Sequence, residues 1–525
     1  LTITAGTFNT LDSDGGSSHA LTVTGTTTIG PASGAADQAT LTCNASAVSL
    51  GTTRQQGDYA LNIEQGGTFV GGTGTHTVGS MSMAQSANAK ATMTTGVMTI
   101  NGYNNSANKA WRVEYGGDTF DNANGTVRFN FNGFDTRMSM RSESHANNAF
   151  HNLIIQMNGD SRTLSIDNGT DVKVDNDLTV SRGILNVGSN HNLEVVGHVE
   201  VGTDSEVSNL KFSASSTKTA TFKSILIGAN GTYEATSGTT TLKGEHTNGF
   251  AWYNNGTFTD NDGTVTIGDG SSSIGTTHIL ENRFHHLIIN RDASNVNTIW
   301  RDASGNTLTI DGNLTITKGF FYRNTVTDTL TVTGDVDIAA NGNLGLTADT
   351  GANNFGGIKI ASGGTYNATS GTTTITNRFT GESHLWKNDG GTFNHNNGTV
   401  KFNDNDHSAV KENTFYNVEV ASNLGDYAVT FEAQGGGGNA FTILNNLTIT
   451  RGDFELTNAD DTCDIYGQTI INGSSNAGAR FNNDKNQTAT ITHHGLVTII
   501  TGTYHVEDGA TVNMAGIRNV GGLVD

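Results

Sequence analysis

The chain has 525 residues, of which 67 are glycine and only one, Pro31, is proline. Charged residues make up 15 %, and 28 Lys and Arg against 49 Asp and Glu give a net charge of −21. This composition excludes a charge-rich or proline-rich disordered tail and a collagen triple helix, and its acidity argues against a protein that binds nucleic-acid phosphates.

The two cysteines, Cys43 and Cys463, are far apart in the sequence, and neither belongs to a CxxC pair. Their number excludes a disulfide framework, and their spacing gives no support to a zinc or redox motif. Apolar runs such as 225–227 are too short for a membrane-spanning helix, so we expect no membrane insertion.

A six-residue pattern at the start of the chain returns three times. Its four copies are Leu1–Gly6 (LTITAG), Leu178–Gly183 (LTVSRG), Leu314–Gly319 (LTITKG) and Leu447–Gly452 (LTITRG). They predict repeat units at 1–177, 178–313 and 314–446, a partial unit at 447–525, and an insertion in the first unit near 81–108. Because Leu1 falls inside a repeat, we expect the chain to be a section of a longer repetitive polypeptide.

Three further markers keep the same order inside the units, which indicates one period of about 134 residues. The first is a GTY segment, at 231–242 and 364–375, that restarts at 502. The second is a GTV segment preceded by Asn or Asp, at 124–127, 262–265 and 397–400. The third marker begins with a phenylalanine, which is Phe150, Phe284 or Phe415. A tryptophan always precedes the second marker, and these tryptophans are Trp111, Trp252 and Trp386.

Within each unit, short stretches alternate apolar and polar residues and begin with glycine, as in Gly312–Ile316 and Gly398–Phe402. Strict alternation predicts strands rather than helices, and glycine with Asn or Asp supplies the corners between them. We therefore predict an all-β protein with the fold of an elongated β-solenoid. At roughly 20 residues per coil it would have about 25 coils. The alternative is a string of β-sandwich domains, one per long repeat.

Several segments resemble repeat regions of large structural proteins of marine bacteriophages, and they are also similar to repeats of giant secreted bacterial adhesins. The resemblance rests on 364–375 (GTYNATSGTTTI), 388–400 (NDGGTFNHNNGTV), 413–418 (NTFYNV) and 446–452 (NLTITRG). It implies an extracellular or virion rod, and it implies no catalytic residues.

Calcium is the one cofactor with sequence candidates. Asp260 with Asp262, and Asp404 with Asp406, group carboxylates on turns, which calcium favours, although the spaced glutamate of an EF-hand is missing. The other interpretation is solvated corners closed by Asx turns. The segment 71–78 nearly matches a calcium-binding nonapeptide, but His76 stands where the liganding aspartate should be.

Other residues allow both a structural and a functional interpretation. The pairs His285–His286 and His493–His494 predict side chains on opposite faces of a strand, which does not suit one metal ion. The repeated phenylalanines predict core stacking. Trp252 and Trp386 would stack on glycans if exposed and fill the core if buried, and the second interpretation is preferred.

The sequence therefore predicts a mechanical function rather than an enzyme. The first hypothesis is a phage virion fibre or appendage that spaces or displays a tip, with copies of itself or other virion proteins as partners. The alternatives are a bacterial surface adhesin that binds host glycans and a polysaccharide-degrading solenoid enzyme. No catalytic carboxylate pair stands out, no cofactor other than calcium is suggested, and we expect an extracellular location on a virion or cell surface.

Overall fold

The structure is a computed structural model. Side chains are described for every residue in the ranges that follow, except 54–55. The structure describes residues 1–12, 14–31, 35, 37–51, 54–55, 57–83, 88–114, 119–140, 148–167, 171–271, 275–302, 305–346, 349–404, 406–422, 428–434, 440–456, 462–474, 478–482, 489–506 and 509–525.

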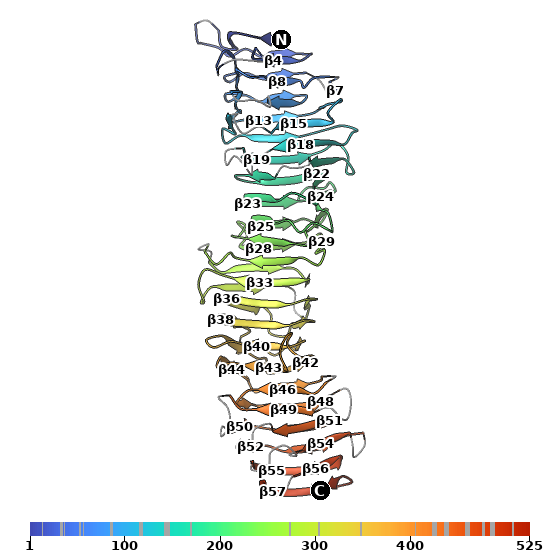
Figure 1. Cartoon of the computed structure of the whole chain (residues 1–525). Coiled ribbons are helices and arrows are strands. Elements are labelled where there is room, and N and C mark those ends of the chain that lie inside the picture. Colours follow the sequence, from blue (N-terminus) through green and yellow to red (C-terminus); the bar gives the residue numbers. More distant parts are fainter. Residues whose placement is uncertain are drawn as a thin grey trace. The chain divides into compact units, whose positions relative to one another are not determined.

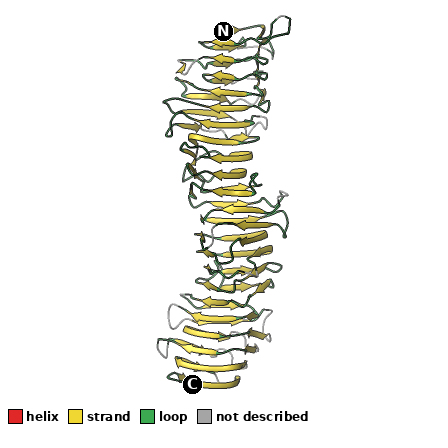
Figure 2. Cartoon of the chain, turned by 180° about the vertical axis from the view of Figure 1, so that it is seen from behind, coloured by secondary structure: helices red, strands yellow, loops and turns green. Residues whose placement is uncertain are grey.

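The described residues contain strands, turns and loops but no helix, so none of them forms a helix that could cross a membrane (Figure 2). The chain divides into two compact units, Leu1–Thr264 and Val265–Asp525. Each unit is a parallel β-solenoid, and together they have about 18 turns. The predicted β-solenoid is confirmed, and the β-sandwich alternative is wrong because strands pair with strands one turn away in parallel rather than in antiparallel hairpins.

In the first unit, coloured blue to green in Figure 1, strands of successive turns lie side by side in register. Four of them are β22 (Leu178–Gly188), β23 (Leu193–Val201), β25 (Ala220–Ile227) and β28 (Phe250–Asn254). Leu178 pairs with Val199, Val199 with Ile225, and Ile225 with Trp252, so each turn places one apolar residue directly beside that of the turn before.

The second unit repeats this arrangement (Figure 1). Its corresponding strands are β36 (Leu314–Arg323), β38 (Val336–Leu344), β40 (Ile358–Ile360) and β43 (His384–Asn388). Leu314 pairs with Val336, Val336 with Ile358, and Ile358 with Trp386. These partners are further apart in the sequence than the roughly 20 residues expected per coil. The expected number of coils was therefore too high, because corners and loops lengthen most turns.

The long strands begin where the sequence repeats begin. β22 starts at Leu178, β36 at Leu314, and β51 (Leu447–Leu456) at Leu447. Each pairs along its first half with the strand that carries the phenylalanine marker's apolar residues: β19 (Asn152–Gln156), β33 (His286–Asn290) and β48 (Asn417–Ala421). The division into compact units at 264/265 therefore does not coincide with a repeat boundary.

The core of the solenoid repeats its aromatic packing from one long repeat to the next. In the first unit Tyr233 stacks on Phe258 at 6.0 Å and 18°, and Phe258 meets Trp252 edge-on at 4.6 Å. In the second unit the ring centroids of the equivalent Tyr366 and Phe393 are 5.8 Å apart, with an interplanar angle of 18°. The rings of Phe393 and Trp386 are 4.7 Å apart. Offset aromatic pairs contribute about 0.5–1.5 kcal/mol each beyond their buried area.

The glycine of the GTV marker is required by close packing between turns. A Cβ on Gly398 would lie 2.0 Å from the carbonyl oxygen of Thr369, one turn away. The same contact is 1.8 Å at Gly125 and 2.2 Å at Gly263. Since the obstacle is backbone, no side-chain movement relieves it.

We expect Gly398→Ala to lower the free energy of unfolding by about 2–3 kcal/mol, because the backbone of two turns must separate. Gly275→Ala is the matched control, since a Cβ there meets nothing within 4 Å. Urea unfolding of both variants is the measurement. Equal stability of the two variants would contradict close packing at the marker glycine.

Candidate functional site

The tryptophans considered for glycan stacking are core residues. Trp111, Trp252 and Trp386 are each 0 % exposed. The indole Nε1 of Trp386 donates to Glu412 Oε2 at 3.3 Å, inside the turn. Trp252 and Trp386 therefore present no ring face to a sugar, and the preferred interpretation as core residues agrees with their burial. Phe150, Phe284 and Phe415 are also fully buried, as expected from their repeat position.

The segment that resembled a calcium nonapeptide is a copy of the GTY marker. The whole copy spans 67–78 and forms β9 (Gly67–Val70) and β10 (His76–Val78), as the marker in the second repeat forms β26 (Gly231–Glu234) and β27 (Thr239–Leu242). Phe69 then takes the place of Tyr233, and His76 that of Thr240. His76 is buried, its Nε2 lies 2.7 Å from Gly71 O, and burial lowers its pKa. The core packing explains this histidine.

The turn that contains Asp260 and Asp262 also has equivalents in other repeats. The amide of Asp262 donates to Asp260 Oδ1 at 3.1 Å. In the first repeat the amide of Asn124 donates to Asn122 Oδ1, and in the third the amide of Asn397 donates to His395 Nδ1, both also at 3.1 Å. In all three turns the two residues before glycine have positive φ. An amide and an imidazole thus perform the role of Asp260, so the turn requires an acceptor rather than a charge.

The second pair of calcium candidates uses its carboxylates separately. Asp404 is buried and accepts a hydrogen bond from the hydroxyl of Ser408. Asp406 is exposed and pairs with Arg378 at 2.8 Å. Each carboxylate therefore has a protein partner of its own.

We expect Asp260→Asn to change the free energy of unfolding by less than about 0.5 kcal/mol, because Asn122 already fills the same position in the first repeat. We also expect calcium to shift the melting temperature of this variant and of the wild type equally. Thermal unfolding with and without calcium measures both. A calcium-dependent rise in the wild type alone would establish the calcium site.

The side chains of His493 and His494 lie on opposite faces of their strand, as the alternation predicts. His493 is buried, with Nδ1 2.8 Å from Thr469 Oγ1 and Nε2 2.9 Å from Tyr504 Oη. His494 is exposed and lies 3.0 Å from Asp464. In the first pair, His286 Nδ1 accepts the amide hydrogen of Asn313 at 2.9 Å. These contacts give His286, His493 and His494 structural roles. A ring nitrogen of His285 instead lies within 4.8 Å of carboxylate oxygens of Asp260 and Asp262.

Burial, with a smaller effect of the His494 charge, lowers the pKa of His493 from 6.5 to about 4. Between these values the unfolded chain binds a proton that the folded chain does not, so stability is lost as pH falls from 6.5 toward 4. The loss amounts to about 3 kcal/mol. Urea unfolding at pH 7 and pH 4.5 should show it in the wild type and in His494→Gln, and His493→Gln should reduce it. An unchanged pH dependence in His493→Gln would contradict this assignment.

A hollow with a polar lining in the first unit lies beside the described part of the insertion, residues 81–83 and 88–108. It has a volume of about 590 Å³. Its base is formed by three strands in register: β8 (Leu61–Ile63), β11 (Met81–Met83) and β15 (Lys109–Val113). Asn62, Ser82 and Arg112 occupy the outward positions of these strands, and Asp58, Tyr59 and Glu64 line the same cleft.

A short hairpin forms one wall of the cleft. β14 (Tyr103–Asn104) turns back into β15, with Asn104 paired antiparallel to Lys109. The Asn104 side-chain carbonyl accepts the amides of Ser106 and Ala107 at 2.8 and 2.9 Å, and its side-chain amide donates to Gly57 O at 3.1 Å. One side chain thus closes the hairpin and fixes it to the segment that precedes Tyr59.

Tyr59, Arg112 and Glu114 interact with one another beneath the cleft. Tyr59 is 5 % exposed, and its hydroxyl is shielded from solvent. Burial raises the pKa of Tyr59 to about 12, and the charge of Arg112 and its side-chain contact with Tyr59 oppose this rise. Arg112 is held in turn by Glu114, 3.2 Å from its Nε.

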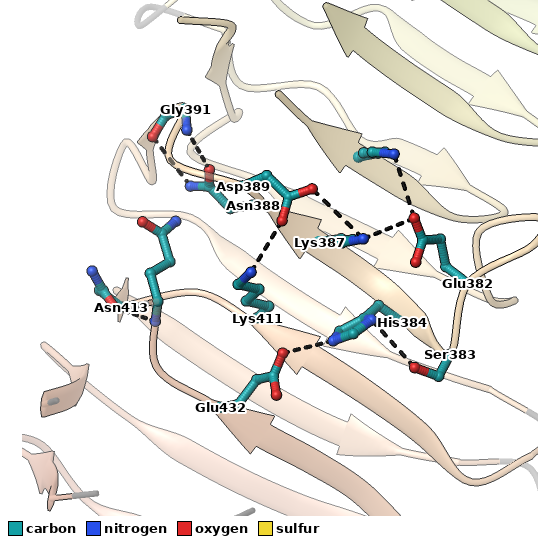
Figure 3. Close-up of polar contacts among 12 residues, drawn as sticks. Glu382, Ser383, His384, Lys387, Asn388, Asp389, Gly391, Lys411, Asn413 and Glu432 are labelled. Atoms are coloured by element: carbon teal, nitrogen blue, oxygen red, sulfur yellow. Dashed lines mark hydrogen bonds and ion pairs between the residues drawn. The ribbon is translucent and has the colours of Figure 1, made fainter. Parts of the chain in front are cut away.

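The third repeat has a charged network at the equivalent face (Figure 3). Lys359, Lys387 and Lys411 follow one another in register on β40, β43 and β46 (Ser408–Lys411). Like charges on neighbouring strands repel, but Glu382 lies 2.8 Å from Lys387, and Asp389 lies 3.0 Å from Lys411. The Lys387 contact lowers the pKa of Glu382. This face is neutralised by its own ion pairs.

The repeats explain why the two faces differ. Lys387 follows Trp386 as Arg112 follows Trp111, and the residues one turn earlier are Lys359 and Ser82. A serine in place of a long lysine leaves space above the sheet in the first repeat. The insertion was predicted from the sequence, but the cleft was not. The seven-residue spacing of Gly67 and Gly74 is the signal that aligns this segment with the later markers.

No protein-family model matches the chain, and no curated protein sequence matches it either. The resemblance to phage and adhesin repeats therefore stays a prediction.

Proposed function

We propose that this chain is a structural rod segment of a bacteriophage virion fibre or fibre-like appendage, located outside the cell, which spaces or displays a tip without catalysis. The observation that supports it is the repetition of structural roles. Tyr233 and Tyr366, with their hydroxyls 2.9 Å from Thr240 and Thr373, make the same contacts in different repeats. A chain selected for repeated packing, rather than for one reactive site, has the properties of a spacer.

The solenoid suits a mechanical role because every turn is hydrogen-bonded to the next through parallel strands. With roughly nine turns at about 4.8 Å per turn, each unit alone would extend on the order of 40 Å. The net charge of −21 keeps such a surface soluble and discourages lateral association. Copies of the chain or other virion proteins are the partners that this role requires, and no cofactor is needed.

The adhesin alternative loses the contacts first considered for it, since Trp252 and Trp386 are buried. Polysaccharide degradation requires two carboxyl groups that converge on a glycosidic bond. The carboxylates of Asp260, Asp406 and Glu382 instead contact a backbone amide, an arginine and a lysine respectively.

Immunogold electron microscopy with antibodies raised against the chain tests the proposal on material from its source. We expect gold on fibres or appendages of virus particles. Gold confined to the surface of bacterial cells would favour the adhesin and contradict the virion location. Release of reducing ends from polysaccharides by the purified chain would instead identify an enzyme.

A further inference from the structure

The packing shared by the repeats does not explain the cleft of the first unit, whereas it does explain the buried aromatic residues and the marker glycines. The equivalent face of the third repeat is filled by lysines and their acidic partners, whereas the first repeat has Ser82 and a fixed hairpin around a hollow of about 590 Å³. This volume falls within the range of about 300–1,000 Å³ found for small-molecule sites.

We propose that this cleft binds a neutral saccharide unit. Its polar groups are of the kinds that recognise vicinal hydroxyls: the carboxylates of Asp58 and Glu64, the amide of Asn62 and the guanidinium of Arg112. Carboxylates accept hydrogen bonds from sugar hydroxyls, and a guanidinium donates to them in a fixed geometry.

The charge of the lining selects among sugars. Two carboxylates and one guanidinium leave a net charge of −1, in a chain whose net charge is already −21. A sulfated, phosphorylated or uronic sugar would bring further negative charge to this lining, so a neutral sugar is favoured.

Two features indicate that the site is built in advance. Asn104 fixes the hairpin wall through three hydrogen bonds, and Glu114 orients Arg112, so little conformational freedom is lost on binding.

The test uses the full chain on an array of neutral and acidic oligosaccharides, followed by calorimetry with the neutral sugar that gives the strongest signal. Glu64→Gln and Arg112→Met alter the cleft. Glu382→Gln and Lys387→Met are the matched controls, because they make the same kinds of chemical change at the equivalent face of the third repeat. Thermal unfolding of all four variants verifies that each is folded.

We expect each cleft variant to weaken binding at least tenfold and each control to bind as the wild type does. The proposal is overturned if no neutral sugar binds, if only acidic sugars bind, or if cleft and control variants behave alike. None of these outcomes bears on the virion location, which the immunogold experiment tests independently.

Discussion

Parallel strands hydrogen-bond the described turns of the solenoid to the turns on both sides, and the composition and close packing of the chain follow from this. The amide of Leu314 donates to Asp335 O, and the amide of Val336 donates to Gly357 O, each at 2.9 Å. A strand inside such a stack must donate and accept along both edges, which explains why a chain of 525 residues has a single proline. It also explains why turns approach so closely that Gly398 has no room for a Cβ.

Equivalent positions of different repeats make the same contact even where the residue type differs. Asn122, Asp260 and His395 accept the same backbone amide, although their charges and shapes differ. His76 occupies the core position that Thr240 has in the second repeat. Asp260 and His76, which suggest metal binding when considered singly, therefore have structural explanations when the repeats are compared. At the cleft beside Arg112 the first repeat departs from the third in shape as well as in sequence.

Much of the fold was predictable because its determinants are local. Alternation such as that in Leu314–Ile316 fixes which side chains face the core, and the order of the repeated markers fixes the periodic architecture. The burial of Trp386 follows from its constant position among apolar strands. The length of a turn was not predictable in the same way, because corner loops vary in length without changing the alternation that identifies the strands.

The all-β repetitive architecture, with its strands, corner glycines and inward residues, could be predicted from the sequence because these features depend on neighbours along the chain. Which residues of different turns meet could be seen only in the folded chain. Asn62, Ser82 and Arg112 become one surface through the register between strands of successive turns. Lys359, Lys387 and Lys411 become a neutralised network for the same reason. Register between turns depends on the lengths of the loops that join them, and no local pattern in the sequence encodes it.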